Sequence, residues 1–256
     1  LLLLLMQVLL IVISLFSFFI GTNSFSFYIL LGLIFLYVLS IYNLYISSFS
    51  KASLFLKLTL FSGVLILFIL ASQSPRRREL LAGIIPVFKT EVKSVDEVYP
   101  DGLSNGGIAT YLSKLKASVF KSDIKESEIV ITADTIVCIG SIVLGKPKTK
   151  EDAVRMLSQL SGKTHEVITG VTIMSNEKST SFYDKTLVTF YELSDEEIEY
   201  YVSKDKPYDK AGSYGIQEWI GYIGIKEMKG DYYNVMGLPL HQLYRQLKSF
   251  ILEEVS

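Results

Sequence analysis

Ile66-Leu67-Phe68-Ile69-Leu70-Ala71-Ser72-Gln73-Ser74-Pro75 is an apolar run that ends in small and turn-forming residues. This pattern is typical of a buried strand that leads through a loop into a helix. Ser74 can cap that helix, Pro75 fits its first turn, and Gly83 follows its end. The same apolar residues also close a longer hydrophobic run that starts at Ala52. From the residues alone they could instead end a membrane helix.

The residues upstream are almost entirely apolar. Leu1–Ile20 and Phe25–Ile46 form two further runs, each close to the roughly 20 residues that cross a bilayer as a helix. A cleaved signal peptide fits less well, because no basic region precedes the first run. We therefore expect residues 1–65 to be an apolar, helical N-terminal segment, which is either a membrane anchor or the product of a start site placed too far upstream.

The remainder of the chain has the composition of one globular domain. Of the 25 basic and 26 acidic residues, only Lys51 and Lys57 lie in the first seventy, so the rest is slightly acidic. This balance argues against a general nucleic-acid binder. A single cysteine and two histidines exclude a disulfide framework, a multi-cysteine zinc site and a histidine-rich metal centre. We expect one domain over residues 66–256.

Helical and strand patterns alternate early in this domain and strands pair late, which predicts an α/β domain with a mixed sheet. Asn176 and Glu177 predict a hairpin between two long strands. Expected strands cover residues 66–70, 87–90, 129–139, 165–174, 181–191 and 221–228. Expected helices cover residues 76–82, 108–119 and 149–160, one that opens at residues 194–197, and one that starts at Pro239.

The first candidate cluster is the loop and helix start that contain Ser72, Ser74, Arg76 and Arg77. The backbone N–H groups at a helix N-terminus, together with hydroxyls and guanidinium groups, suit phosphate oxygens. The alternative is a capped helix with a solvated basic first turn. Arginines in a first turn oppose the helix dipole, which favours a functional reading.

The second candidate is Asp134, which lies within an otherwise apolar strand. A buried carboxylate is costly unless it is paired or bound to a metal, so Asp134 is a candidate metal ligand or general base. The alternative is an aspartate that only caps a turn at a strand end. Cys138, in the same strand, is expected to be an inert buried residue.

Two loops complete the candidates. Lys146 stands between Gly145 and Pro147, where it can meet a phosphate or simply occupy a surface turn. Residues 209–217 are rich in glycine and end in Gln217, whose amide could read a base edge. The common Gly-rich nucleotide motifs are absent from the sequence. Together the candidates fit a Mg²⁺-dependent reaction on a phosphorylated small molecule.

The order of these blocks resembles the Maf family of septum-formation proteins. Six segments carry the resemblance, which spans roughly Ile66 to Phe250: residues 70–81, 133–137, 145–147, 160–165, 209–217 and 237–240. Members of this family normally begin just before the first strand. The resemblance therefore assigns residues 66–70 to a strand and implies a Maf/ITPase-like fold.

The resemblance implies a nucleoside triphosphate pyrophosphatase that cleaves between the α- and β-phosphates. Asp134 resembles the family's proton acceptor, and Glu97 with Asp134 would hold a divalent cation, Mg²⁺ or Mn²⁺. The implied phosphate-binding residues are Ser72, Ser74, Arg77, Lys116 and Lys146. The implied specificity residues are Arg76, Thr135 and Gln217, which resemble the dTTP/UTP subgroup rather than the subgroup that acts on 7-methyl-GTP.

The sequence departs from the family's pattern after Gln217. Glu218 and Trp219 follow, where many members have glycine, so Trp219 could reshape or merely cover the base pocket. The expected partner is a nucleoside triphosphate, not nucleic acid, and the resemblance leaves a homodimer open. The catalytic domain is expected in the cytoplasm, with a membrane contact only through residues 1–65. The alternative function is a non-catalytic, nucleotide-binding regulator of cell division.

Overall fold

The computed structural model describes residues 66–255. The expectations for the apolar segment 1–65 lie outside the described residues. Within the described range, no helix combines the length and the apolar character that crossing a membrane requires.

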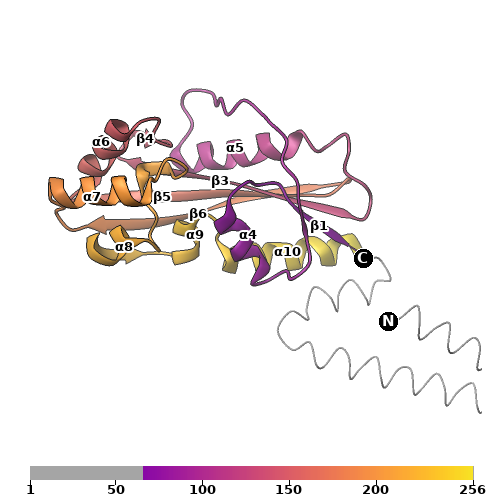
Figure 1. Cartoon of the computed structure of the whole chain (residues 1–256). Coiled ribbons are helices and arrows are strands. Elements are labelled where there is room, and N and C mark those ends of the chain that lie inside the picture. Colours follow the sequence, from indigo (N-terminus) through magenta and orange to yellow (C-terminus); the bar gives the residue numbers. More distant parts are fainter. Residues whose placement is uncertain (1–65, 256) are drawn as a thin grey trace, which may run out of the picture. The chain divides into compact units, whose positions relative to one another are not determined.

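A mixed sheet forms the centre of the domain (Figure 1). Its strand order is β2-β1-β3-β5-β6-β7, and β4 pairs with β3. β1 pairs in parallel with β2 and β3, whereas the pairs β3–β5, β5–β6 and β6–β7 are antiparallel. The predicted mixed sheet is confirmed. The strands are β1 Leu67–Leu70, β2 Lys89–Thr90, β3 Glu128–Ile139, β4 Ile142–Leu144, β5 Thr164–Met174, β6 Ser179–Phe190 and β7 Ile225–Lys229.

Helices cover both faces of this sheet (Figure 1). On one face, α4 and α10 pack on the inner strands, and their Leu81 and Leu247 join Leu70 and Ile131 in one buried cluster. α5 lies on the opposite face, while α6 and α7 pack together near one end of the sheet. The helices are α4 Pro75–Ala82, α5 Asn105–Ser118, α6 Lys150–Leu160, α7 Asp195–Asp205, α8 Trp219–Gly224, α9 Tyr232–Met236 and α10 Leu240–Val255, with the 3₁₀ turn η1 Ala211–Ser213.

α5 lies unusually close to β5 because of a glycine. A Cβ atom at Gly170 would lie 2.2 Å from the carbonyl oxygen of Ala109, so only glycine lets the helix backbone approach this strand. Lys116 is on the same helix, and the close approach brings it over the middle of β3.

Most predicted elements are confirmed, including the Ser74 cap of α4 and the capping box formed by Ser194 and Glu197 at α7. The strand predicted over residues 221–228 is wrong in its first half, because Trp219–Gly224 forms α8 and only Ile225–Lys229 forms β7. The N–H of Gly221 donates to the Glu218 carbonyl oxygen at 2.9 Å, which turns the chain before it can pair with β6. The short elements β4 and α9 were not predicted.

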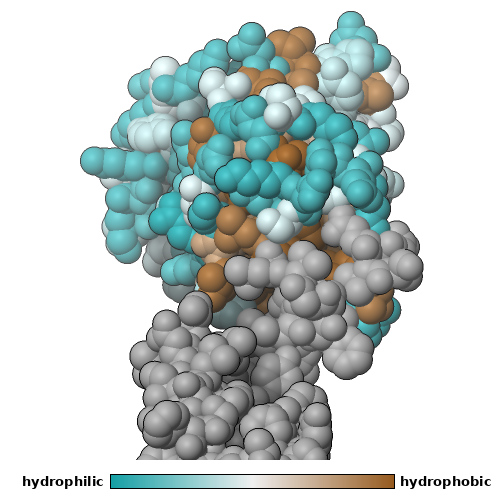
Figure 2. Space-filling model, turned by 90° about the vertical axis from the view of Figure 1, so that its right-hand side faces the viewer, coloured by the Kyte–Doolittle hydropathy of each residue, from teal (hydrophilic) through white to brown (hydrophobic). Residues whose placement is uncertain are grey.

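The surface of the domain is mixed. The face shown in Figure 2 is largely hydrophilic, with apolar residues scattered among the polar ones. Such a surface is ordinary for a globular domain.

Candidate active site

The loop after β1 is ordered by its own hydroxyl groups. The Ser72 Oγ accepts the N–H of Ser74 at 3.2 Å, and the Ser74 Oγ accepts the N–H of Arg77 at 3.4 Å. The second bond is the predicted N-cap of α4. These contacts fix the direction in which the first turn of α4 presents its side chains.

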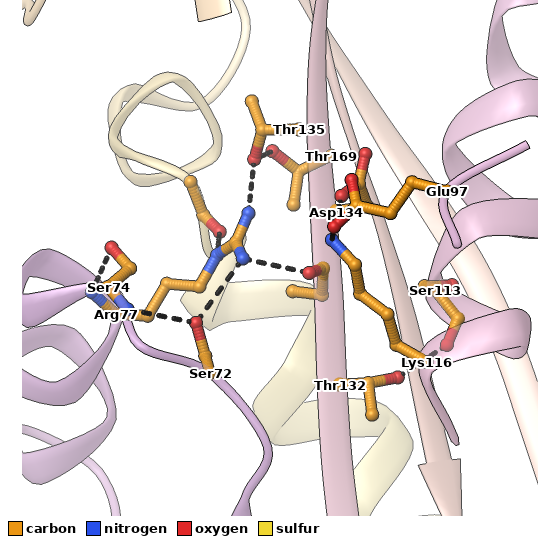
Figure 3. Close-up of polar contacts among 12 residues, drawn as sticks. Ser72, Ser74, Arg77, Glu97, Ser113, Lys116, Thr132, Asp134, Thr135 and Thr169 are labelled. Carbon is orange, nitrogen blue, oxygen red and sulfur yellow. Dashed lines mark hydrogen bonds and ion pairs between the residues drawn. The ribbon is translucent and has the colours of Figure 1, made fainter. Parts of the chain in front are cut away.

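Arg77 ties this turn to two other parts of the chain (Figure 3). Its Nε donates to the Gly237 carbonyl oxygen and its Nη1 to the Ala133 carbonyl oxygen, both at 2.8 Å. Nη1 also donates to the Ser72 Oγ at 3.4 Å, and Nη2 donates to the Thr135 Oγ1 at 2.9 Å. Burial lowers the pKa of Arg77 from its ordinary value, although a guanidinium stays charged in proteins. Four of its five N–H groups are thus used within the protein.

A chain of hydrogen bonds with a fixed direction continues from Arg77. Thr169 donates its hydroxyl proton to the Asn234 carbonyl oxygen at 2.9 Å, so its Oγ1 accepts the proton of Thr135, 2.9 Å away. Thr135 in turn accepts from Arg77. The fully buried Asn234 side chain donates to the Val167 carbonyl oxygen at 3.0 Å. Thr135 is therefore held in place by α4, β5 and α9.

Asp134 is buried on the α5 side of β3, where it forms an ion pair with Lys116. The Lys116 Nζ also lies 3.1 Å from the Glu97 Oε1, so two carboxylates converge on one ammonium group (Figure 3). The pairing offsets the cost of burying Asp134. The reading of Asp134 as a turn cap at a strand end does not hold, since residue 134 lies in mid-strand.

The residues present fit a Mg²⁺ site that is completed by substrate. Mg²⁺ commonly takes one or two carboxylates together with phosphate oxygens, and Glu97 and Asp134 already converge on one cationic group. In the described part of the chain, no set of three or more His, Cys, Asp or Glu side chains is placed to hold a metal ion.

Two adjoining cavities bring the predicted residues together. The first has about 680 Å³ of free space, including its open mouth. The second lies between the loop after β1 and residues 92–97. All ten site residues predicted from the sequence line one or both cavities: Ser72, Ser74, Arg76, Arg77, Glu97, Lys116, Asp134, Thr135, Lys146 and Gln217.

Lys146 and Gln217 face the first cavity in different ways. Lys146 is exposed and lines both cavities, so its ammonium group is open to a ligand. The Gln217 Oε1 is buried and has no hydrogen-bond partner among the described residues. A buried acceptor without a partner is costly, so this oxygen has unused hydrogen-bonding capacity.

Residues that sequence reasoning did not single out also line the first cavity. Asp209 accepts from the Arg76 Nη1 at 3.2 Å and from the Lys210 Nζ at 2.9 Å. Tyr214 is buried beside them, and its hydroxyl lies 2.7 Å from the Nε2 of His165. The glycine-rich segment 209–217 stands out in the sequence, but nothing in its spacing shows that Lys210 within it is buried.

Other expectations for single residues are settled by packing. Trp219 packs on Tyr200, with 4.8 Å between ring centroids, and lies outside the described lining of both cavities. Cys138 is buried, as expected, and burial raises the pKa of its thiol to about 11. The second histidine, His241, lies on α10.

Comparisons with known proteins show which family the chain resembles. A family model described as "Maf-like protein" matches residues 67–250. A dTTP/UTP pyrophosphatase of Porphyromonas gingivalis is 51% identical over 185 residues, covering 71% of this chain and 93% of that protein. A dTTP/UTP pyrophosphatase of Phocaeicola vulgatus is 52% identical over 183 residues, covering 70% and 94%.

Two solved structures were also found. One is a nucleoside-triphosphatase, or dITP/XTP pyrophosphatase, of Mycobacterium abscessus, with 12% identity, a TM-score of 0.34, and coverage of 49% of this chain and 74% of that one. The other is the Ham1 protein of Staphylococcus aureus, with 14% identity, a TM-score of 0.36, and coverage of 50% and 72%.

Proposed function

The chain belongs to the Maf family, and on this premise we propose that it hydrolyses nucleoside triphosphates between the α- and β-phosphates. The products are a nucleoside monophosphate and pyrophosphate. The observation that carries this proposal is the meeting of ten residues from separate segments around two adjoining cavities, with the buried Asp134 lining the first and its partner Lys116 lining both.

Asp134 acts as the proton acceptor in this reaction. A water molecule beside its carboxylate attacks the α-phosphorus and gives its proton to Asp134. The bond between the α-phosphorus and the bridging oxygen breaks, and the electron pair leaves with pyrophosphate. The exposed ammonium of Lys146 stabilises the charge that grows on the leaving group.

Lys116 and Glu97 set the charge around Asp134. A divalent cation, when bound between Glu97, Asp134 and the phosphates, would offset the phosphate charge and polarise the phosphoryl oxygen. Lys116 already bridges the same two carboxylates. Its flexible stem lets the ammonium turn toward a phosphate that enters the cavity.

The preferred substrates are dTTP and UTP. The edge of uracil or thymine carries one N–H donor between two carbonyl acceptors. The amide of Gln217 offers one acceptor and one donor, and its acceptor lies buried in the cavity wall without a partner. A side chain of this kind would pair with the N–H and one neighbouring carbonyl group of the base. The similar proteins of Porphyromonas gingivalis and Phocaeicola vulgatus are named dTTP/UTP pyrophosphatase, which supports the same preference.

Product analysis tests the proposal. The protein is incubated with UTP and Mg²⁺ in ¹⁸O-labelled water, and the products are identified by ³¹P NMR and mass spectrometry. We expect UMP that carries the label, together with unlabelled pyrophosphate. A chelator should abolish turnover, and added Mg²⁺ or Mn²⁺ should restore it. UDP and orthophosphate, or label in pyrophosphate, would contradict the proposed bond cleavage.

A further inference from the structure

A lysine is buried in the wall of the first cavity. Lys210 is only 7% exposed, although lysine is among the residues least often found buried. Its ammonium lies 2.9 Å from the Asp209 Oδ1 and 3.0 Å from the Glu218 Oε1. A buried cation needs such partners, so the position of Lys210 depends on these two carboxylates.

Glu218 is anchored from its other side. Its Oε2 accepts the hydroxyl proton of the fully buried Tyr201, and the same Tyr201 oxygen accepts the N–H of Gly215 at 3.1 Å. A Cβ atom at Gly215 would lie 2.7 Å from the Glu218 Cδ, so the carboxylate occupies space that only glycine leaves open. Glu218 thus holds segment 209–217 at two points, directly at Lys210 and through Tyr201 at Gly215.

The two points lead to Arg76 and Gln217, two of the three residues expected to choose the base. Through Lys210 and Asp209, the network reaches the Arg76 Nη1, which lies 3.2 Å from the Asp209 Oδ2. Gln217 directly precedes Glu218 in the chain, and its carbonyl oxygen accepts the Tyr222 hydroxyl at 2.9 Å. The side chains of Arg76 and Gln217 line the same cavity.

We propose that Glu218 is a positioning residue for base selection, which holds Arg76 and Gln217 in place through Lys210, Asp209 and Tyr201. This inference rests on the proposed function. Glu218 is absent from the residues that line either cavity, so it acts through others. Asp134 and Lys116 lie on β3 and α5, outside this network, so the chemical step does not depend on Glu218.

The test is Glu218→Gln, which removes the charge and keeps the shape. Steady-state kinetics are measured with UTP and CTP, whose pyrimidine rings differ in the donor and acceptor groups at the base edge. We expect KM for UTP to rise about tenfold or more, as the loss of a hydrogen bond to a charged group produces, while kcat stays within about threefold. The preference for UTP over CTP in kcat/KM should fall about fivefold or more.

A matched control is Glu199→Gln, which makes the same change in α7, the helix that carries Tyr201. Glu199 forms an exposed ion pair with Lys150 at 2.6 Å, and such pairs contribute little. This variant should keep the wild-type KM, kcat and preference. Thermal unfolding of both variants separates a loss of fold from a loss of base selection.

Several outcomes overturn the inference. Equal losses of kcat for every nucleotide, or an unchanged UTP/CTP preference, would leave Glu218 a purely structural role. If Glu218→Gln does not fold, Tyr201→Phe is tested instead, since it keeps both charges and should shift KM in the same direction. Failure of both to fold, with Glu199→Gln intact, also overturns it. A wild-type protein that does not hydrolyse UTP would instead refute the proposed function.

Discussion

The guanidinium of Arg77 donates a hydrogen bond to the hydroxyl of Thr135, with 2.9 Å between Nη2 and Oγ1. The Thr135 hydroxyl in turn donates a hydrogen bond to the Oγ1 of Thr169. Little hydrogen-bonding capacity is therefore left for a ligand on either residue: Arg77 keeps one N–H donor, and Thr135 keeps one acceptor lone pair. A residue expected to hold phosphate and one expected to choose the base depend on each other for their positions.

This dependence predicts the effect of replacing Arg77. Lysine cannot reach the carbonyl oxygens of Gly237 and Ala133 and the Thr135 hydroxyl at once, because its ammonium lacks the planar fork of arginine. We expect Arg77→Lys to lower the free energy of unfolding by about 2–4 kcal/mol and to reduce hydrolysis as well. Chemical denaturation measures the first effect. Arg78→Lys, one residue further along α4, is the control and should leave stability unchanged; equal stability of both variants would count against the bridging role.

Gln217 gives a prediction about the base. If its amide pairs with the edge of uracil or thymine, Gln217→Ala should lower kcat/KM for UTP by about 10-fold to 100-fold. The variant should lose less activity toward nucleotides that never used the amide. The measurement is kcat/KM for UTP, dTTP, CTP and 7-methyl-GTP with wild type and variant. A wild-type preference for 7-methyl-GTP would refute the assignment of the base.

Local chemistry made most of the fold and site predictable. The Ser74 cap, the capping box at Ser194 and the apolar stretch of β3 each show themselves within a few residues of sequence. The helix α8 is not predictable from its own residues. Its first turn depends on the position of Glu218, whose carbonyl oxygen accepts the N–H of Gly221 and whose carboxylate pairs with Lys210. The ion pair between Lys116 and Asp134 joins two separate elements, α5 and β3, so no local pattern reveals it. The burial of Lys210 depends on the loop that returns Glu218 to its ammonium group, and the spacing of these residues does not show that course.

His165 predicts how stability changes with pH. Burial lowers its pKa from 6.5 to about 4, so the folded state favours the neutral ring. Its contribution is fully present above pH 6.5 and is lost as the pH falls from 6.5 toward 4, by on the order of 3 kcal/mol. Urea denaturation of wild type and His165→Gln is measured across this range. The difference between the two curves should shrink as the pH falls; a constant difference would contradict the burial of a neutral histidine.

β1 predicts how far the chain can be shortened. Phe68, Ile69 and Leu70 are almost fully buried between β2 and β3. A chain that begins at Ala71 should not fold, since it loses about 5–9 kcal/mol of apolar burial and the pairing partner of β3. A chain that begins at Leu60 should fold and hydrolyse nucleotides. Circular dichroism and turnover are measured for both, and a folded, active protein starting at Ala71 would show that the strand is dispensable.

The central claim is that Asp134 accepts the proton of the attacking water. The most direct measurement is kcat for pyrophosphate release from UTP by Asp134→Asn, with thermal unfolding to confirm the fold. The amide keeps the shape but cannot accept the proton, so we predict a fall of at least about 100-fold, the lower end of a general-base contribution, in a folded protein that still binds the nucleotide. A folded Asp134→Asn protein with near-wild-type kcat would contradict the account.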